Sequence, residues 1–166
     1  MSRGLGDVYK RQGKLSNAEE NEVDYYKGIA YQKLGNDAES TKYLMKATQG
    51  STEPQQAFYY NDQQPDKIFY QGLAWRALGE ENKARSRFNK LIDHGKKHLF
   101  DDCKIDYFAV SLPELAIWED NLNIRNQIHC YYVMALGYSG LGKEELAEEY
   151  YEKVKRLDVN KQVFRM

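Results

Sequence analysis

Two histidines one helical turn apart are the residues of this sequence best spaced to hold a metal ion. His94 and His98 have the i, i+4 spacing that puts two imidazoles on one helix face, and Cys103 follows shortly after. No recognisable motif fixes a third ligand. Histidines near a helix end are also common without a metal, because their positive charge interacts favourably with the helix dipole. We therefore expect no metal site.

Carboxylates crowd the stretch 98–120, and paired carboxylates can do general acid-base work. They belong to Asp101, Asp102, Asp106, Glu114, Glu119 and Asp120. Nothing in the sequence fixes the distance between any two of them, and solvated loop charges and helix N-caps are commoner roles. His129 and Cys130 are adjacent, so on a helix they point about 100° apart and cannot share a site. Cys130 is better explained as a small core residue.

Known catalytic signatures are missing from the sequence, which has no Gly-rich phosphate loop, no GxSxG and no HExxH. We expect no enzyme activity and no cofactor. The 24 Lys and Arg are balanced by 25 Asp and Glu without a long block of like charge, which disfavours nucleic acid and membranes as partners. Two cysteines without CxxC spacing, and no long apolar run, favour a cytoplasmic protein.

Helical periodicity and turn residues divide the chain into pairs of helices. We expect the pairs at about 17–50, 65–97 and 121–157, with insertions at about 51–64 and 98–120. Ser16 with Glu19, and Asn36 with Glu39, form N-terminal capping patterns. Pro65 suits the first turn of a helix. Both insertions are expected to hold short helical segments.

The first residues, MSRGLGDVYKRQ, carry no helical or strand period. Their DVYKRQ end resembles the translated adapter remnants found in reading frames from metagenome assemblies. We therefore expect residues 1–12 to be a non-native, disordered leader, residues 13–166 to form a single domain, and the native start to lie upstream.

The three pairs show the same residue types when they are aligned on the glycines that join their helices, Gly35, Gly79 and Gly142. In the first helix a small residue lets the partner helix approach, and an aromatic fills the angle between them. Small and large apolar residues of the second helix pack against them. The columns are Gly28, Tyr31, Leu44 and Ala47 in the first pair; Gly72, Trp75, Ala84, Phe88 and Leu91 in the second; and Ala135, Tyr138, Ala147, Tyr151 and Val154 in the third.

This column pattern resembles the tetratricopeptide repeat, a helix-turn-helix unit of about 34 residues that stacks into a superhelix. The resemblance implies an all-α fold of helical hairpins stacked as an α-solenoid. The joining glycines are 44 and then 63 residues apart, so helical insertions of about 10 and 29 residues separate the repeats. The stretch 65–160 is also similar to the C-terminal part of long bacterial multi-repeat proteins, in which an N-terminal domain of unassigned function precedes the array.

In the tetratricopeptide family, ligands usually lie in a concave groove lined by the first helix of each pair. By register, the resemblance gives this role to Tyr25, Ile29, Gln32, Lys33, Phe69, Leu73, Arg76, His129, Tyr132, Leu136 and Ser139. It implies a non-catalytic scaffold that binds a peptide, a protein or a neighbouring domain of the same longer chain. Two alternatives stay open. The groove aromatics pack against the insertions, or the chain is the tail of a carbohydrate-processing enzyme whose active site lies upstream.

Overall fold

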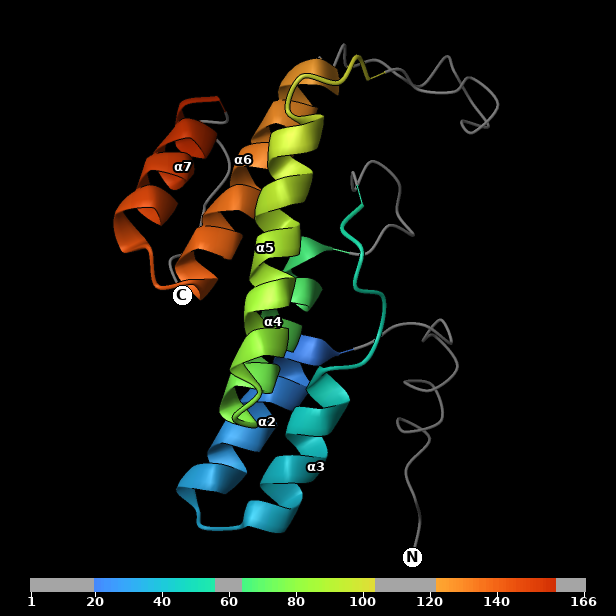
Figure 1. Ribbon diagram of the computed structural model, residues 1–166, viewed down its shortest axis with the longest axis vertical. Coiled ribbons are helices and arrows are strands. Elements are labelled where there is room, and N and C mark those ends of the chain that lie inside the picture. Colours follow the sequence, from blue (N-terminus) through green and yellow to red (C-terminus); the bar gives the residue numbers. More distant parts are fainter. Residues whose placement is uncertain (1–19, 56–63, 104–121, 158–166) are drawn as a thin grey trace, which may run out of the picture.

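The structure is a computed structural model and describes residues 20–55, 64–103 and 122–157. These ranges contain only helices as regular elements, and Figure 1 shows them as three successive pairs. The pairs are α2 (Asn21–Lys33) with α3 (Asp37–Ala47), α4 (Pro65–Ala77) with α5 (Glu81–His98), and α6 (Leu122–Gly140) with α7 (Glu144–Leu157). The predicted all-α fold of stacked helical hairpins is confirmed in the described part of the chain. None of its helices is both long and apolar enough to cross a membrane.

Several predictions fall on residues 1–19, 56–63, 104–121 and 158–166, which lie outside the described residues. They include the leader, the capping pattern of Ser16 with Glu19, and most of the 98–120 insertion.

Each pair turns at the glycine on which the sequence alignment is based. Gly35, Gly79 and Gly142 have positive φ angles of 73°, 80° and 71°, a backbone conformation that glycine adopts without steric cost. In every turn the amide after the glycine donates to the carbonyl of the column aromatic at 2.9 Å, as Asn36 N to Tyr31 O, Glu80 N to Trp75 O and Lys143 N to Tyr138 O. The three hairpins therefore share one register.

The second helix of the first pair begins largely as the sequence predicts. Asn36 Oδ1 accepts a hydrogen bond from Glu39 N at 3.2 Å and so caps α3. The Glu39 carboxylate does not bond back to Asn36 but forms an ion pair with Lys42 at 2.9 Å.

The start of α4 also agrees with the sequence. Pro65 is the first residue of this helix, where the amide hydrogen that proline lacks is not needed for a helical hydrogen bond.

Close approach at the small-residue column is confirmed in the first two pairs. A Cβ on Gly28 would lie 2.6 Å from Leu44 Cγ, and a Cβ on Gly72 would lie 2.7 Å from Phe88 Cζ. The third pair has Ala135 in this column, and its side chain is fully buried. Small residues are therefore required here because the second helix lies directly against them.

The ring of Phe88 is held between two helices that flank α5. It is fully buried, and a Cβ on Gly140 of α6 would lie 2.6 Å from its Cγ, just as one on Gly72 of α4 would meet its far edge. Gly137 allows a further close contact, since a Cβ there would lie 2.7 Å from the Phe88 carbonyl oxygen. Phe88 thus fixes the spacing of α4, α5 and α6 together.

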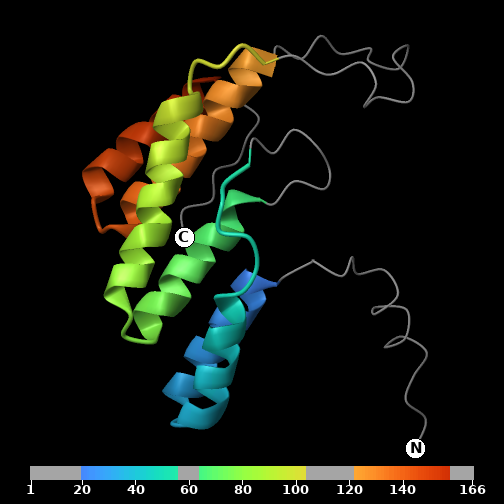
Figure 2. The same cartoon turned by 45° about the vertical axis from the view of Figure 1, so that its right-hand side comes forward.

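Helix α4 lies in the middle of the molecule and packs against α2, α3, α5 and α6. The largest apolar cluster joins α4, α5 and α6 and consists of Ile68, Phe69, Ala84, Phe88, Leu91, Val133 and Leu136. A smaller cluster of Leu44, Ala47 and Ala74 joins the first pair to α4. Figure 2 shows this first pair at one end, with α4 between it and the later helices. The first pair is therefore attached through the smaller apolar contact.

The column aromatic of the second pair is covered differently from those of the other two pairs. Trp75 is only partly buried, and its ring faces the Lys83 ammonium, which lies 4.4 Å from the ring centroid. In the other pairs this aromatic stacks on a tyrosine of the second helix at ring centroid distances of 5.5 and 5.4 Å, as Tyr31 on Tyr43 and Tyr138 on Tyr150. The difference arises because a cation covers Trp75 where a tyrosine ring covers the other two.

Candidate functional site

Residues 48–55 leave α3 and cross the later helices; they are here termed the linker. Buried amide side chains hold its first half. Gln71 Nε2 on α4 donates to the carbonyl oxygens of Gln49 at 2.8 Å and Ser51 at 3.0 Å. Asn21 Nδ2 on α2 donates to the same Gln49 carbonyl at 2.8 Å. The linker backbone is thereby tied to the first helices of two pairs.

The second half of the linker reaches α5 and α6. Lys90 on α5 donates to Thr52 Oγ1 at 3.3 Å and forms an ion pair with Glu53. His129 Nε2 on α6 donates to the Gln55 carbonyl oxygen at 2.8 Å. His129 is a predicted groove residue, and its imidazole is engaged in this hydrogen bond to the linker. For this residue the alternative interpretation, packing against an inserted segment, describes the geometry.

The predicted groove residues of α2 separate into two groups. Tyr25 and Ile29 pack against the cluster that joins the first pair to α4, and the Tyr25 ring centroid lies 5.7 Å from that of Tyr70. Gln32 and Lys33 lie in the last turn of α2 and are exposed. The structure does not bring these four residues to the pocket described below.

Two predicted groove residues of α4 contribute to contacts between helices. Leu73 is partly buried against the main apolar cluster. Arg76 Nη2 donates to the Gly140 carbonyl at 2.6 Å, while its Nε forms an ion pair with Glu81 at 3.1 Å. The guanidinium also lies 5.0 Å from the ring centroid of Phe88. Arg76 therefore links α4 to the end of α6.

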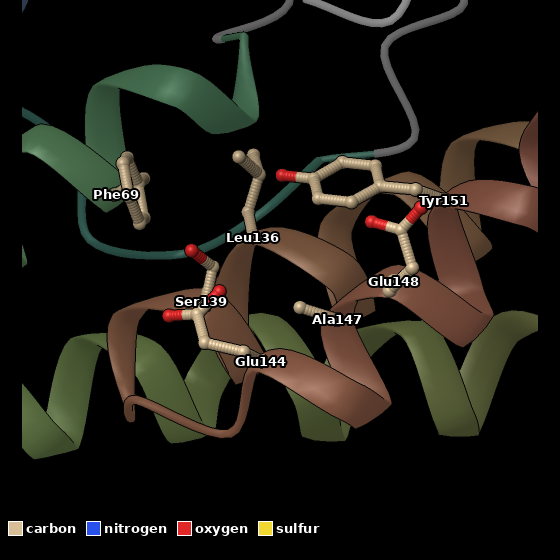
Figure 3. A pocket seen from close by; sticks show the side chains of 7 residues that line it. All are labelled: Phe69, Leu136, Ser139, Glu144, Ala147, Glu148 and Tyr151. Carbon is tan, nitrogen blue, oxygen red and sulfur yellow. The ribbon is translucent and has the colours of Figure 1, made fainter. Parts of the chain in front are cut away.

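A pocket of about 400 Å³ opens between α4, α6 and α7, and the remaining predicted residues gather at or near it. Figure 3 shows the side chains that line it, which are Phe69, Leu136, Ser139, Glu144, Ala147, Glu148 and Tyr151. The first three are predicted groove residues. Ala147 and Tyr151 are predicted packing residues, and both also face this space.

Sequence reasoning missed the two acidic side chains of the pocket. The helical pattern of α7 predicts Glu148 on the water-facing arc, but Glu148 is partly buried and its carboxylate lies beside Tyr151 in Figure 3. Glu144 lines the pocket together with Ser139. Glu144, Glu148 and Tyr151 fall on one stripe of α7 at i, i+4 and i+7 spacing. That stripe was the available signal, and in the structure it lines the pocket together with Phe69 of α4 and with Leu136 and Ser139 of α6.

Negative charge acts on the tyrosines at this site. Burial, followed by the charges of Asp66, Glu144 and Glu148, raises the pKa of Tyr151 to about 12. Tyr132, a predicted groove residue, donates its hydroxyl to Asp66 Oδ1 at 2.7 Å. Burial and the same Asp66 charge raise the Tyr132 pKa as well. Both phenols therefore stay protonated, and Tyr132 donates its proton to Asp66.

Two stretches of the chain match family models of the tetratricopeptide repeat. Residues 68–94 cover most of α4 and part of α5, and residues 128–160 cover most of α6 and all of α7. These two stretches are similar to tetratricopeptide repeats. Repeats of this kind generally mediate contacts between proteins or act as scaffolds. No solved structure matches the chain. The pocket lies where the two matched repeats meet.

Three histidines of α5 and α6 lie together. The His94 ring centroid is 4.6 Å from that of His98 and 6.1 Å from that of His129. Burial, followed by the charges of those two neighbours, lowers the pKa of His94 to about 4. His98 Nδ1 contacts Asp101 Oδ2 at 2.6 Å. In the described residues no group of three such side chains is arranged to hold a metal ion.

Cys130 is fully buried, as predicted, and burial raises its pKa to about 12.

Proposed function

We propose that this chain is a non-catalytic interaction module that holds a peptide segment of a partner, or of a neighbouring domain, in the pocket between α4, α6 and α7. The observation that supports this proposal most directly is the position of the pocket between the two matched repeats. Both matched repeats contribute side chains to it, Phe69 from one and Leu136 and Ser139 from the other. A segment bound there contacts both repeats at once, as a scaffold requires.

The size and lining of the pocket favour part of a peptide over a larger ligand. Its volume of about 400 Å³ is near the lower end of the range of about 300–1,000 Å³ typical of ligand pockets. That space accepts one or two side chains of an extended segment. Phe69, Leu136 and Ala147 supply apolar contact, while the hydroxyls of Ser139 and Tyr151 can fix the orientation of the segment.

The lining also favours binding over catalysis. A serine nucleophile needs a neighbouring base, and no histidine, lysine or cysteine accompanies Ser139 among the described residues that line the pocket. The alternative, the tail of an enzyme, depends on the carboxylates of the 98–120 insertion. Asp101 contacts His98, and most of the other carboxylates lie outside the described residues. We therefore favour the interaction module.

Peptides selected from a random display library on the wild-type protein test the proposal. Ser139→Trp fills the pocket with an indole, whereas the matched control Ser86→Trp adds the same side chain at an exposed position of α5. We expect peptides to bind the control as they bind the wild type and to lose about tenfold or more in affinity on Ser139→Trp. Circular dichroism melts establish that both variants fold. Selected peptides that bind all three proteins equally would rule out the pocket as the binding site.

A further inference from the structure

Helix α2 carries a stripe of apolar residues on its exposed face, here termed the α2 stripe. Val23, Tyr26, Ala30 and Leu34 recur at three- and four-residue steps, so they lie in one line along the helix. Val23, Tyr26 and Leu34 are 44%, 50% and 78% exposed, and Ala30 is exposed as well. In the described part of the chain eight large hydrophobic side chains are exposed, and three of them fall on this stripe. Such clustering indicates a contact surface, whereas apolar residues exposed singly do not.

The corresponding face of α4 and of α6 is covered by another helix. Counted back from the joining glycine, Ala30 corresponds to Ala74 of α4 and to Gly137 of α6. Ala74 is fully buried in a cluster with Leu44 of α3, and a Cβ on Gly137 would lie 2.7 Å from the Phe88 carbonyl oxygen of α5. In both pairs the second helix of the preceding pair covers this position. The α2 stripe is therefore a face suited to bind a helix, and none of the described helices covers it.

We propose that the α2 stripe binds a second copy of this chain, so that two α2 helices pack antiparallel about a two-fold axis. The first pair lies at one end of the described helices, as Figure 2 shows. This inference involves no residue of the pocket and is independent of the proposed function. A two-fold contact uses the same patch on both copies, so the patch must be complementary to itself.

The α2 stripe is complementary to itself in size. A two-fold axis that crosses the stripe between Tyr26 and Ala30 places the Tyr26 ring against the partner's Ala30, a large side chain against a small one. The same axis places Val23 against the partner's Leu34. Symmetry repeats both contacts, so each of the four stripe residues meets an apolar residue of the other copy.

The two ends of the α2 stripe are complementary in charge. Glu22 lies in the first turn of α2 and Lys33 in the last, about three helical turns apart and so on the same flank of the stripe. Antiparallel packing brings Glu22 of each copy to the partner's Lys33, whereas parallel packing would bring like charges together. Glu22 also interacts with Tyr70 of its own chain. Charge therefore favours the antiparallel arrangement.

Sedimentation equilibrium of the whole chain tests whether it associates. One helix from each copy forms an interface at the low end of the range in which stable contacts bury about 1,200 Å² or more, so we expect a weak dimer with a Kd on the order of 10–100 μM. Between about 5 and about 500 μM protein, the weight-average mass should rise from 19.4 kDa towards twice that value. A mass that stays at that of one chain, or that rises beyond two chains, would overturn the inference.

A charge placed on the α2 stripe tests which surface makes the contact. Ala30→Glu puts two carboxylates beside the two-fold axis, and the control Met45→Glu adds the same charge at an exposed apolar residue of α3 outside the stripe. We expect the dimer Kd to rise about tenfold or more for Ala30→Glu and to change by less than about twofold for the control. Circular dichroism melts establish that both variants fold. Equal effects of the two variants would contradict the proposed surface.

A charge reversal at the ends of the α2 stripe tests the antiparallel arrangement. Lys33→Glu places like charges opposite each other and should weaken the dimer, while the control Lys46→Glu reverses a lysine in the last turn of α3 and should not. Adding Glu22→Lys to Lys33→Glu restores the opposite charges, so the Kd should return to within about threefold of the wild type. If the second substitution does not restore the dimer, Glu22 does not meet the partner's Lys33 and the inference fails.

Discussion

The ring of Phe88, held between Gly72 and Gly140, yields a prediction in which the effect of one substitution changes sign with the background. Gly72→Leu adds a side chain where a Cβ would already lie 2.7 Å from Phe88 Cζ. We expect this substitution to destabilise the wild-type protein. In a Phe88→Ala background the ring is gone, and the same leucine enters the space left behind. There we expect Gly72→Leu to stabilise the protein.

The magnitudes follow from the burial of the ring and from helix propensity. Phe88 is fully buried, so Phe88→Ala should cost about 3 to 5 kcal/mol in free energy of unfolding. Overpacking by Gly72→Leu costs about 3 kcal/mol, and replacing a helical glycine returns about 1 kcal/mol, which leaves a net loss of about 2 kcal/mol. In the Phe88→Ala background only the gain of about 1 kcal/mol remains, so the coupling between the two sites is about 3 kcal/mol.

Urea unfolding of the wild type, both single variants and the double variant measures this coupling, with far-ultraviolet circular dichroism as the signal. The dependence of the free energy on urea concentration should stay constant, so that differences in midpoint report stability. Costs that add within about 0.5 kcal/mol would refute the reasoning, because independent sites behave in that way. Such a result would mean that Gly72 and Phe88 do not share the contact that defines the second pair.

Three further predictions concern other parts of the molecule. The pKa of His94 is lowered to about 4 in the fold from 6.5 in the unfolded chain, so the unfolded state binds more protons between these values. Stability should therefore fall by up to about 3 kcal/mol as pH decreases from about 6.5 to about 4, and urea unfolding of His94→Phe should show a flatter pH profile. Gln71→Ala removes the donor of the Ser51 carbonyl and one of the two donors of the Gln49 carbonyl, and should cost about 1 to 3 kcal/mol in urea unfolding. The exposed control Gln32→Ala should change stability by less than about 0.5 kcal/mol. Amides of α2 and α3 should exchange hydrogen faster than those of α5 and α6, because the cluster joining the first pair to α4 is small; equal protection would contradict this.

The repeat register was predictable because each column residue acts within its own helical pair. Tyr31, Trp75 and Tyr138 stand at the same distance before a joining glycine, and all three carbonyls accept the same turn hydrogen bond. Such short-range geometry is encoded by spacing alone. The burial of Trp75 was not predictable in this way, since it depends on Lys83 from the second helix covering the ring instead of a tyrosine.

The pocket was predictable only in part, because it depends on how whole helices cross. Phe69, Leu136 and Ser139 follow from register, since they belong to the first helices of their pairs. Glu148 was predicted to face solvent because the apolar pattern of α7 shows which face of the helix is buried. The same pattern does not show which other helix lies near the border of that face. His129 was assigned to the groove because the path of the linker has no periodic signal in the sequence.

The contacts at the two ends of the linker imply that the number of residues between Ser51 and Gln55 matters. Gln71 and His129 both recognise main-chain oxygens, which every residue type supplies. These three hydrogen bonds therefore do not depend on which side chain stands at position 51 or 55. Adding or removing one residue between them shifts the downstream carbonyl by about 3.3 Å, which is beyond the reach of the imidazole. The distance between these two carbonyls along the chain is therefore set by the helices that bind them, and an insertion or deletion between them would break one of the contacts.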